Sequence, residues 1–327
     1  MAALHAHVFA AQNPATCRAQ RFLVMSASAW PYGLGSFLEL TCSWLSHALR
    51  TNRILVFRNP DGFSYAKETR AGIEALLHPL SNCSFQTVQD CTDCDVEHIT
   101  DLLGDGFREA SARLARFQFL TPVQYRAVLM HYVFQPRASV LAEMRAVWQQ
   151  AAVAPDEVFA AAVMVRRGDK AYDRPAVAIH PQVNMSFVDQ YAFMYPLPLY
   201  MAHVARCPGA RSNTTERTRI FLMTDSSAVG EEEMRAFPDV QAVELREERR
   251  TGDVAGWAPV VVQSPEFNAT RHSITAMASM WMVAHRCRSL VLTFTSTIQK
   301  ASFELYFARG GSPGCVHSLD SSYYIYP

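Results

Sequence analysis

The chain alternates short runs of mainly apolar residues with longer segments in which apolar residues recur at helical spacing. In the first half, the runs RFLVMSA (21–27) and RILVF (53–57) flank a glycine turn and a helical segment that extends from Ser36 to Leu49. Strand, turn, helix and strand in this order predict a βαβ unit with a parallel sheet. Further segments are assigned by the same spacing: helices at 67–77, 106–118, 122–133 and 138–150, and a loop at 81–95.

The second half repeats this alternation. We predict strands at 158–165, 219–223, 240–245 and 289–294, and helices at 187–205, 226–237, 272–286 and 297–307. Pro196 and Pro198 must break or kink the first of these helices. Two consecutive α/β halves predict an α/β fold with two doubly wound, Rossmann-like domains, residues 1–153 and 154–327, facing across a cleft.

The composition argues against nucleic acid as a partner and against a membrane-spanning segment. Half of the 327 residues are hydrophobic, and 30 basic residues balance 30 acidic ones. Without a basic tail or stripe, the chain lacks the electrostatic pattern of a nucleic-acid-binding protein. Any bound anion must therefore be held by a local site. No apolar run is long enough to span a membrane and no clear signal peptide is visible, so we expect no membrane anchor within this chain.

Sequons and cysteines indicate the compartment. Four asparagines open an N-x-S/T sequon: Asn82, Asn184, Asn213 and Asn268. Eight cysteines, an even number, are compatible with disulfides or with buried free thiols. The C-x-x-C at Cys91 and Cys94 could form half of a zinc site, but no second pair lies at ribbon spacing, so we predict no metal. We expect a glycoprotein with disulfide bonds in the lumen of the Golgi or another secretory compartment.

The segment VMVRRGDKAYD contains the most informative charges. A predicted strand leads directly into Arg166, Arg167, Asp169 and Lys170. Three cations at one strand end suit a diphosphate, because a guanidinium group can bond two phosphate oxygens at once. The alternative is a solvated surface turn in which Asp169 pairs with an arginine.

Three other strand–helix junctions offer anion-binding groups. Gly33 and Gly35 precede a helix whose N-terminal N–H groups could face a phosphate, or they form only a tight turn. Ser296 and Thr297, within LTFTST, could donate to phosphate, and one of them could simply be an N-cap. Asp225 follows a strand and either caps the next helix or binds a hydroxyl of ribose or acceptor.

Four segments, taken in their order along the chain, resemble a known superfamily. They are the GLG turn with ALRTNRILVF, then VMVRRGDK, then IFLMTDS, and finally SLVLTFTSTIQKASFELYFARGG. It is the superfamily of inverting, metal-independent fucosyltransferases with the two-domain GT-B fold. The chain is similar to the α-1,6-fucosyltransferases of N-glycan cores at VRRGDK and MTDS, and to plant xyloglucan fucosyltransferases at ALRTNRILVF and around TFTST. The similarity extends over most of residues 21–310, and VRRGDK is its most specific motif.

The resemblance implies GDP-fucose as the donor, a glycan or glycoprotein hydroxyl as the acceptor, and no cofactor. It implies that Arg166 and Lys170 stabilise the diphosphate leaving group while Arg167 supports the same site. It also implies that Ser296 and the turn at 33–35 contact the phosphates. Cations placed in advance where negative charge develops lower the barrier without a metal. We expect the first domain to shape the acceptor site and the second to hold most of the donor.

Two departures leave the nucleotide open. Met164 stands where the core fucosyltransferases carry a histidine, and Met280 stands where they carry an aspartate. Both family residues read the guanine base. Another nucleotide sugar, or a relative that binds a nucleotide or glycan without turnover, is therefore an alternative.

The general base is a hypothesis from the same segment. Arg174 occupies the place of the family's acidic residue, and Asp173 stands one residue earlier. Asp173 or Asp169 could take the proton of the acceptor hydroxyl. An ordinary ion pair with a neighbouring arginine is the alternative.

Overall fold

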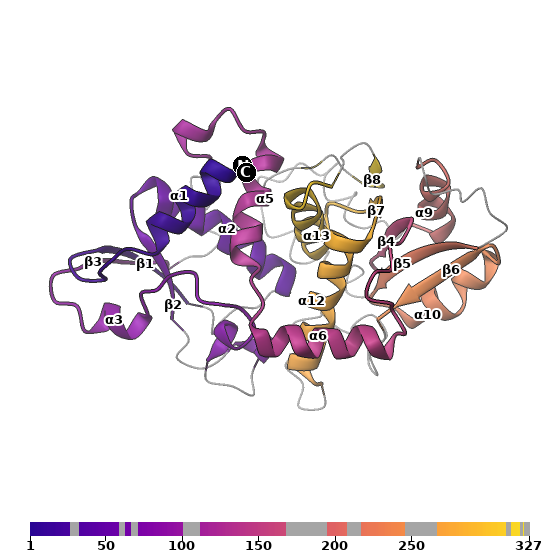
Figure 1. Ribbon diagram of the computed structural model, residues 1–327, viewed down its shortest axis with the longest axis horizontal. Helices are drawn as coiled ribbons and strands as arrows, with labels where there is room; N and C mark the ends of the chain where they lie inside the picture. The colour runs from indigo at the N-terminus through magenta and orange to yellow at the C-terminus, as the bar shows by residue number, and fades with distance from the viewer. Residues whose placement is uncertain are drawn as a thin grey trace. The chain divides into compact units, whose positions relative to one another are not determined.

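The computed structural model describes residues 1–26, 33–58, 63–66, 71–100, 112–167, 195–207, 217–245, 267–311, 315–320 and 323 (Figure 1). The chain forms two compact units, Met1–Leu141 and Ala142–Tyr323, each built on its own parallel sheet. The predicted α/β class with parallel sheets is confirmed. The cleft between two domains and their boundary after residue 153 stay predictions.

The first unit has a three-stranded parallel sheet in the order β2-β1-β3. Its elements are α1 (Ala2–Gln12), β1 (Arg21–Ser26), α2 (Leu34–Arg50), β2 (Ile54–Arg58), α3 (Phe85–Gln89), β3 (Asp95–His98) and α5 (Pro122–Val133), with short 3₁₀ turns at Ser64–Ala66, Gly72–Ala75 and Ala115–Phe117. Four consecutive residues of β1 are buried, as expected for the central strand of a sheet covered on both faces. The predicted strand–helix–strand unit over residues 21–57 is confirmed, and the helix α1 that precedes it was not predicted.

Some local predictions for the first unit are wrong. Residues 81–95 were expected to be a loop, but they contain α3 and the start of β3. The helix expected at 67–77 is a single 3₁₀ turn in its described part. Gly72, the first residue of that turn, has a left-handed φ of 58°, which prevents a regular helix from running through this position. The helix expected at 106–118 shows only the turn at Ala115–Phe117 in its described part.

The exposed edge of β2 is covered by one side chain of α1. Gln12 is fully buried; its side chain accepts from the Leu55 N–H at 2.9 Å and donates to the Arg53 carbonyl at 3.3 Å. The amide therefore bonds the edge strand as a further strand would, which satisfies backbone groups that an edge leaves unpaired.

A buried ion pair joins α2 to α5. Arg126 Nη2 lies 2.7 Å from Glu39 Oε2, and the two side chains are only 2% and 3% exposed. Arg126 also donates to the Ser43 hydroxyl at 3.1 Å and to the Glu39 carbonyl at 3.0 Å. These bonds compensate for part of the cost of removing both charges from water.

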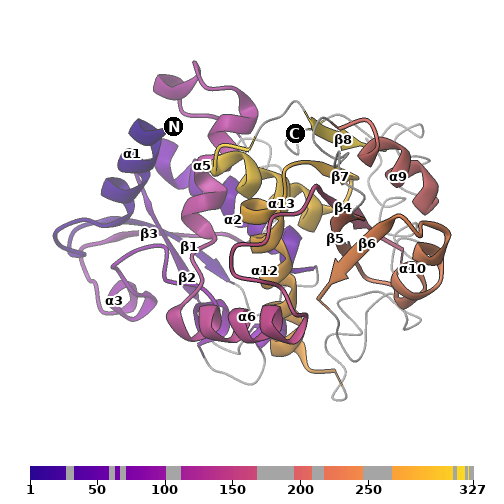
Figure 2. The same ribbon diagram turned by 45° about the vertical axis from the view of Figure 1, so that its right-hand side comes forward.

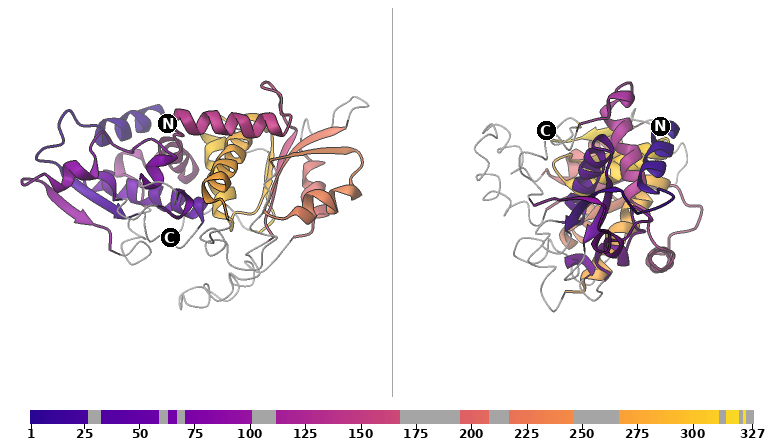
Figure 3. Two further views of the ribbon diagram at one scale, coloured as in Figure 1. Left: turned by 90° about the horizontal axis from the view of Figure 1, so that it is seen from below. Right: turned by 90° about the vertical axis from the view of Figure 1, so that its left-hand side faces the viewer.

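The second unit has a five-stranded parallel sheet in the order β6-β5-β4-β7-β8. Its elements are β4 (Ala161–Val165), α9 (Leu197–Val204), β5 (Thr218–Thr224), α10 (Ser227–Glu231), a 3₁₀ turn (Glu233–Ala236), β6 (Val240–Glu244), α12 (Ala269–Arg286), β7 (Leu290–Leu292), α13 (Thr297–Ala308) and β8 (Val316–Ser318); α6 (Ala138–Gln150) spans the boundary between the units. Within this unit, α9 and α10 cover one face of the sheet, and α12 and α13 cover the other (Figures 2 and 3). Each predicted strand and helix of this half has a counterpart in the described residues. Of the helix predicted at 187–205, residues 187–194 lie outside them, and α9 begins after Pro196. The strand β8 was not predicted.

The cysteines are mostly paired. Disulfides join Cys17 to Cys83, Cys91 to Cys94 and Cys207 to Cys315, whereas Cys42 and Cys287 are buried thiols. The expectation of disulfides is confirmed, and the zinc alternative at the C-x-x-C is incompatible with its pairing. Among the described helices, none combines the length and apolar character that a bilayer span requires.

We expect Arg126→Ala to lower the free energy of unfolding by about 3–5 kcal/mol, because it leaves the Glu39 carboxylate buried without its guanidinium partner. Replacing both residues with apolar ones, Arg126→Met with Glu39→Leu, should cost less than the single change. Urea denaturation followed by circular dichroism measures both. Arg21→Ala, which removes an exposed pair, is the control and should have a small effect. Equal losses in all three variants would contradict a role for the buried pair.

Candidate active site

The order of strands in the second unit reverses beside β4. From β4 the chain continues to β5 and β6 on one side of the sheet, and then to β7 and β8 on the other. In open parallel sheets, ligands bind outside the carboxyl ends of the strands at such a reversal. Ala162 pairs with Leu290 and Val163 with Val291, so the end of β4 lies beside the segment that follows β7.

Arg166 and Asp225 meet at this edge because their strands are in register. Val165 pairs with Thr224, so the next residue of each strand leaves the sheet at the same level. Arg166 Nε lies 3.1 Å from Asp225 Oδ2, and the side chains are 24% and 10% exposed. The ion pair with Asp225 orients the planar guanidinium group of Arg166, and the Arg166 side chain stays partly exposed at the carboxyl edge.

Asp225 also determines the path of the backbone after β4. Its Oδ1 accepts from the Arg167 N–H at 2.8 Å. The helix that follows, α10, has Ser226 at its N-cap position, and Asp225 is not its cap. The alternative in which Asp225 caps this helix is therefore wrong. Asp225 instead connects the ends of β5 and β4.

The side chain of Arg167 is directed into a different set of contacts. Its Nη2 lies 2.9 Å and 3.2 Å from the two carboxylate oxygens of Glu233, and its Nη1 donates to the Tyr195 carbonyl. The guanidinium is 15% exposed. This geometry makes Arg167 a support for the strand end, whereas Arg166 is the better placed of the two to contact a ligand.

The segment between β7 and α13 is held by a carboxylate that sequence analysis missed. Asp320 accepts from the Phe294 N–H at 2.8 Å, from the Thr295 N–H at 3.1 Å and from the Thr295 hydroxyl. The Ser318 hydroxyl donates to it at 2.7 Å. Asp320 follows the three-residue strand β8, which carries no apolar run, so only the fold brings it to this segment.

Ser296 and Thr297 lie at the start of α13. Ser296 occupies the N-cap position with an extended backbone, but no hydrogen bond from its side chain caps the helix. Its side chain is 4% exposed. The cap position is thus confirmed for Ser296, without the capping bond. The first-turn N–H groups of α13 give this end of the helix a partial positive charge that favours an anion.

Gly33 and Gly35 lie in the first unit, at the start of α2. Gly33 is the N-cap residue with an extended backbone, and the helix begins at Leu34, two residues earlier than the sequence indicated. Gly35 therefore belongs to the first turn of the helix rather than to a preceding turn. Both residues stand at the N-terminus of a 17-residue helix, where backbone N–H groups point away from the helix.

Met164 and Met280 are fully buried at 0% exposure. Neither side chain reaches a surface at which a nucleotide base could bind. The positions at which the resembled family reads its base are therefore interior positions in this chain.

Three predicted site residues, Asp169, Lys170 and Asp173, lie outside the described residues. So do Asn184 and Asn213 of the four sequons. Both other sequon asparagines, Asn82 and Asn268, are exposed.

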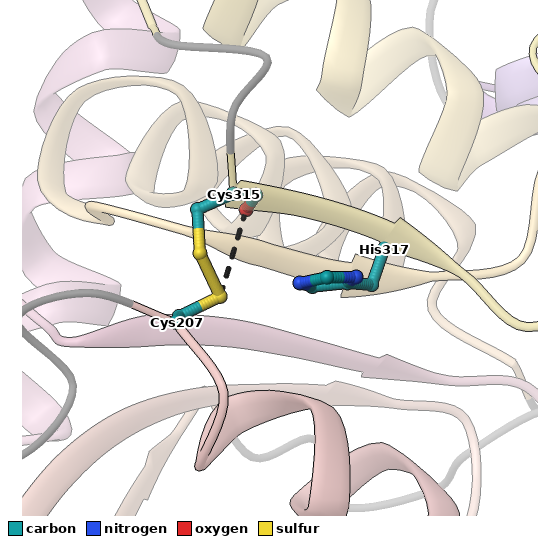
Figure 4. A group of neighbouring side chains, drawn as sticks. All are labelled: Cys207, Cys315 and His317. Atoms are coloured by element: carbon teal, nitrogen blue, oxygen red, sulfur yellow. Dashed lines mark hydrogen bonds between the residues drawn. A yellow bond between two sulfur atoms is a disulfide. The ribbon is translucent and has the colours of Figure 1, made fainter.

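Two groups of side chains in the described part of the chain have metal-ligand chemistry. One is Cys91, Asp93 and Cys94, and the other is Cys207, Cys315 and His317. Figure 4 shows the disulfide between Cys207 and Cys315, with His317 beside it on β8. Metals bind cysteine as thiolate. The paired sulfurs of both groups are therefore committed to disulfides, and we assign neither group as a metal site.

We expect Asp320→Ala to expose the backbone amides of Phe294 and Thr295, because the carboxylate is their hydrogen-bond acceptor. Hydrogen exchange measured on peptides covering 290–300 should become faster in this variant. Asp239→Ala, which removes an exposed aspartate of the same unit, is the control. Unchanged exchange in Asp320→Ala would show that the segment is held by other contacts.

A pH effect should come from His203. Burial lowers the pKa of His203, and the nearby His317 and Arg206 lower it further. Above pH of about 6.5 both folded and unfolded states keep this imidazole neutral. As the pH falls below that value, the unfolded state takes up the proton more readily, so stability declines towards the folded-state pKa.

The stability lost between pH 7.5 and pH 5.5, measured by urea denaturation, should therefore be smaller in His203→Gln than in the wild type. An identical loss in both proteins would mean that His203 does not contribute to the acid sensitivity.

No known family profile and no curated protein matches this chain. Among solved structures, it is similar to NodZ α-1,6-fucosyltransferase soaked with GDP-fucose, at 16% identity over 88% of this chain and 93% of that chain, with a TM-score of 0.46. It is also similar to fucosyltransferase NodZ from Bradyrhizobium, at 15% identity over 86% and 92% of the chains, with a TM-score of 0.46. A mutant of Arabidopsis thaliana FUT1 in complex with GDP shares 12% identity over 93% and 72%, with a TM-score of 0.44. At identities and scores this low the likeness does not extend to activity.

Proposed function

We propose that this protein is a glycosyltransferase that transfers fucose from GDP-fucose to a hydroxyl group of a glycan or glycoprotein, with inversion and without a metal. The observation that carries the proposal is the position of Arg166. It stands at the strand-order reversal of a doubly wound sheet, and Asp225 orients its guanidinium at 3.1 Å. A cation in that position suits the diphosphate of a nucleotide sugar.

The donor site that we propose consists of three groups of residues. Arg166, together with Lys170, contacts the diphosphate, and Ser296 and Thr297 donate to it from the start of α13. Arg167 supports the strand end through Glu233, without being required to touch the ligand.

The geometry of Arg166 and Asp225 supports an electrostatic mechanism. The acceptor oxygen attacks the anomeric carbon, the bond from that carbon to the diphosphate oxygen breaks, and GDP leaves with the electron pair. Negative charge grows on the departing diphosphate, so a guanidinium already held by Asp225 stabilises the transition state more than the ground state. Asp173 or Asp169 is our proposal for the base that takes the acceptor's proton.

We propose the first unit as the acceptor side, and we assign Gly33 and Gly35 to phosphate contacts because the resemblance implies them. Three disulfides support an oxidising compartment. The exposed sequons at Asn82 and Asn268 are compatible with glycosylation there. We therefore propose the lumen of the Golgi or another secretory compartment as the place of action.

Burial of Met164 and Met280 favours a second candidate, the same reaction with a different nucleotide sugar. Guanine recognition in the resembled family depends on polar residues at these two positions. A protein with methionine at both positions must recognise the base through other groups. Its preference among nucleotide bases can be measured directly. Thermal-shift measurements with GDP, UDP, ADP and CDP would rank the bases.

Arg166→Ala should weaken GDP binding by about tenfold to a hundredfold, since a hydrogen bond to a charged group contributes about 1.5–3 kcal/mol. Calorimetric titration of the purified protein with GDP gives this ratio. Arg145→Ala, an exposed arginine of α6, is the matched control and should bind GDP as the wild type does. If Arg166→Ala binds GDP with unchanged affinity, the proposed donor site is wrong. If the wild type binds GDP but releases none from GDP-fucose with any acceptor, the protein is a binding relative.

A further inference from the structure

A pocket of about 330 Å³ opens on the sheet of the first unit. It is lined by Arg58, Phe85, Val88, Gln89, Val96 and His98. Three of these side chains are apolar and three can form hydrogen bonds, so the lining is more polar than that of most small-molecule sites. The volume lies near the lower end of the range for such sites, about 300 Å³, and suits a single sugar ring better than a nucleotide.

The pocket lies at the carboxyl edge of the sheet. Arg58 is the last residue of β2 and His98 is the last residue of β3, on the two sides of β1. Because side chains alternate along a strand, Arg58 shares a face with Val56, and His98 shares it with Val96. This is the face that α3 packs against. The order of strands reverses at β1. The pocket therefore lies where open parallel sheets bind ligands, at the carboxyl ends of strands beside such a reversal, as the candidate site of the second unit does.

Disulfides hold the wall of this pocket in place. The wall is α3, whose five residues are too few to form a stable helix alone. A disulfide from Cys83 to Cys17 anchors the chain directly before the helix, and the disulfide between Cys91 and Cys94 follows directly after it. A wall fixed on both sides loses little further conformational entropy when a ligand binds.

The lining favours a negatively charged ligand with an apolar face. None of the six lining residues is a carboxylate. The Arg58 guanidinium carbon lies 5.9 Å from the centroid of the Phe85 ring. Arg58, Gln89 and His98 are exposed and present N–H donors, and a guanidinium can bind a carboxylate through two parallel hydrogen bonds. Phe85 and Val88 offer an apolar surface to the C–H groups of a ring.

We infer that this pocket binds an acidic sugar, a pyranose that bears a carboxylate, with Arg58 on the carboxylate and the Phe85 ring beside the sugar. The assignment of that sugar to the acceptor glycan rests on the proposed function, whereas the binding itself does not.

The test is a calorimetric titration of the full chain, without donor, with glucuronate, glucose and acetate. Glucuronate should bind at least tenfold more tightly than glucose, which lacks the carboxylate, and than acetate, which lacks the ring. Arg58→Gln should weaken glucuronate binding at least tenfold, and Phe85→Leu should weaken it while leaving acetate binding unchanged. Arg50→Gln, which changes an exposed arginine at the end of α2, is the matched control and should bind like the wild type.

Equal affinity for glucuronate and glucose would overturn the inference, and so would unchanged glucuronate binding in Arg58→Gln. Equal binding of acetate and glucuronate would reduce the pocket to an anion site and overturn the sugar assignment. Far-UV circular dichroism shows whether each variant is folded. The glucuronate titration contains no donor. If a separate titration showed that the wild type does not bind GDP, the proposed function would be refuted, and the glucuronate result would still stand.

Discussion

One carboxylate connects the ends of two neighbouring strands, and the candidate donor site depends on it. Asp225 bonds both the guanidinium of Arg166 and the backbone N–H of Arg167, so the chain leaving β4 has a determined direction. Asp320 does the same for the segment after β7 through the Phe294 and Thr295 amides. Two acidic side chains, neither of which is proposed to react, thus organise the cationic and N–H donor groups at the strand-order reversal.

Much of the fold could be predicted from the sequence because the parallel strands are buried on both faces. Runs such as FLVM at 22–25 and AAVMV at 161–165 have no polar residue, and their alternation with amphipathic helices specifies an α/β fold. In parallel sheets the carboxyl ends of the strands lie at one edge, so candidate groups were sought directly after strands. Arg166 and Asp225, which follow β4 and β5, are neighbours in the structure. A role for either in donor binding stays a prediction.

The rest depends on contacts that local sequence does not express. The strands β3 and β8 are short, mostly exposed or half-buried, and join their sheets by backbone pairing rather than by apolar side chains. The helix α3 is anchored by the disulfide from Cys83 to the distant Cys17. Asp320 cannot be told from any other polar loop residue by its neighbours in the sequence. Its three hydrogen bonds with Phe294 and Thr295 exist only because β8 lies beside β7.

The most direct measurement is a crystal structure of the protein with GDP and a soluble acceptor glycan. The account predicts phosphate oxygens at hydrogen-bonding distance, about 3 Å, from the Arg166 guanidinium, with Asp225 still bound to Arg166 Nε. It also predicts that the phosphates face the start of α13. A diphosphate bound elsewhere, with Arg166 directed into bulk solvent, would contradict it.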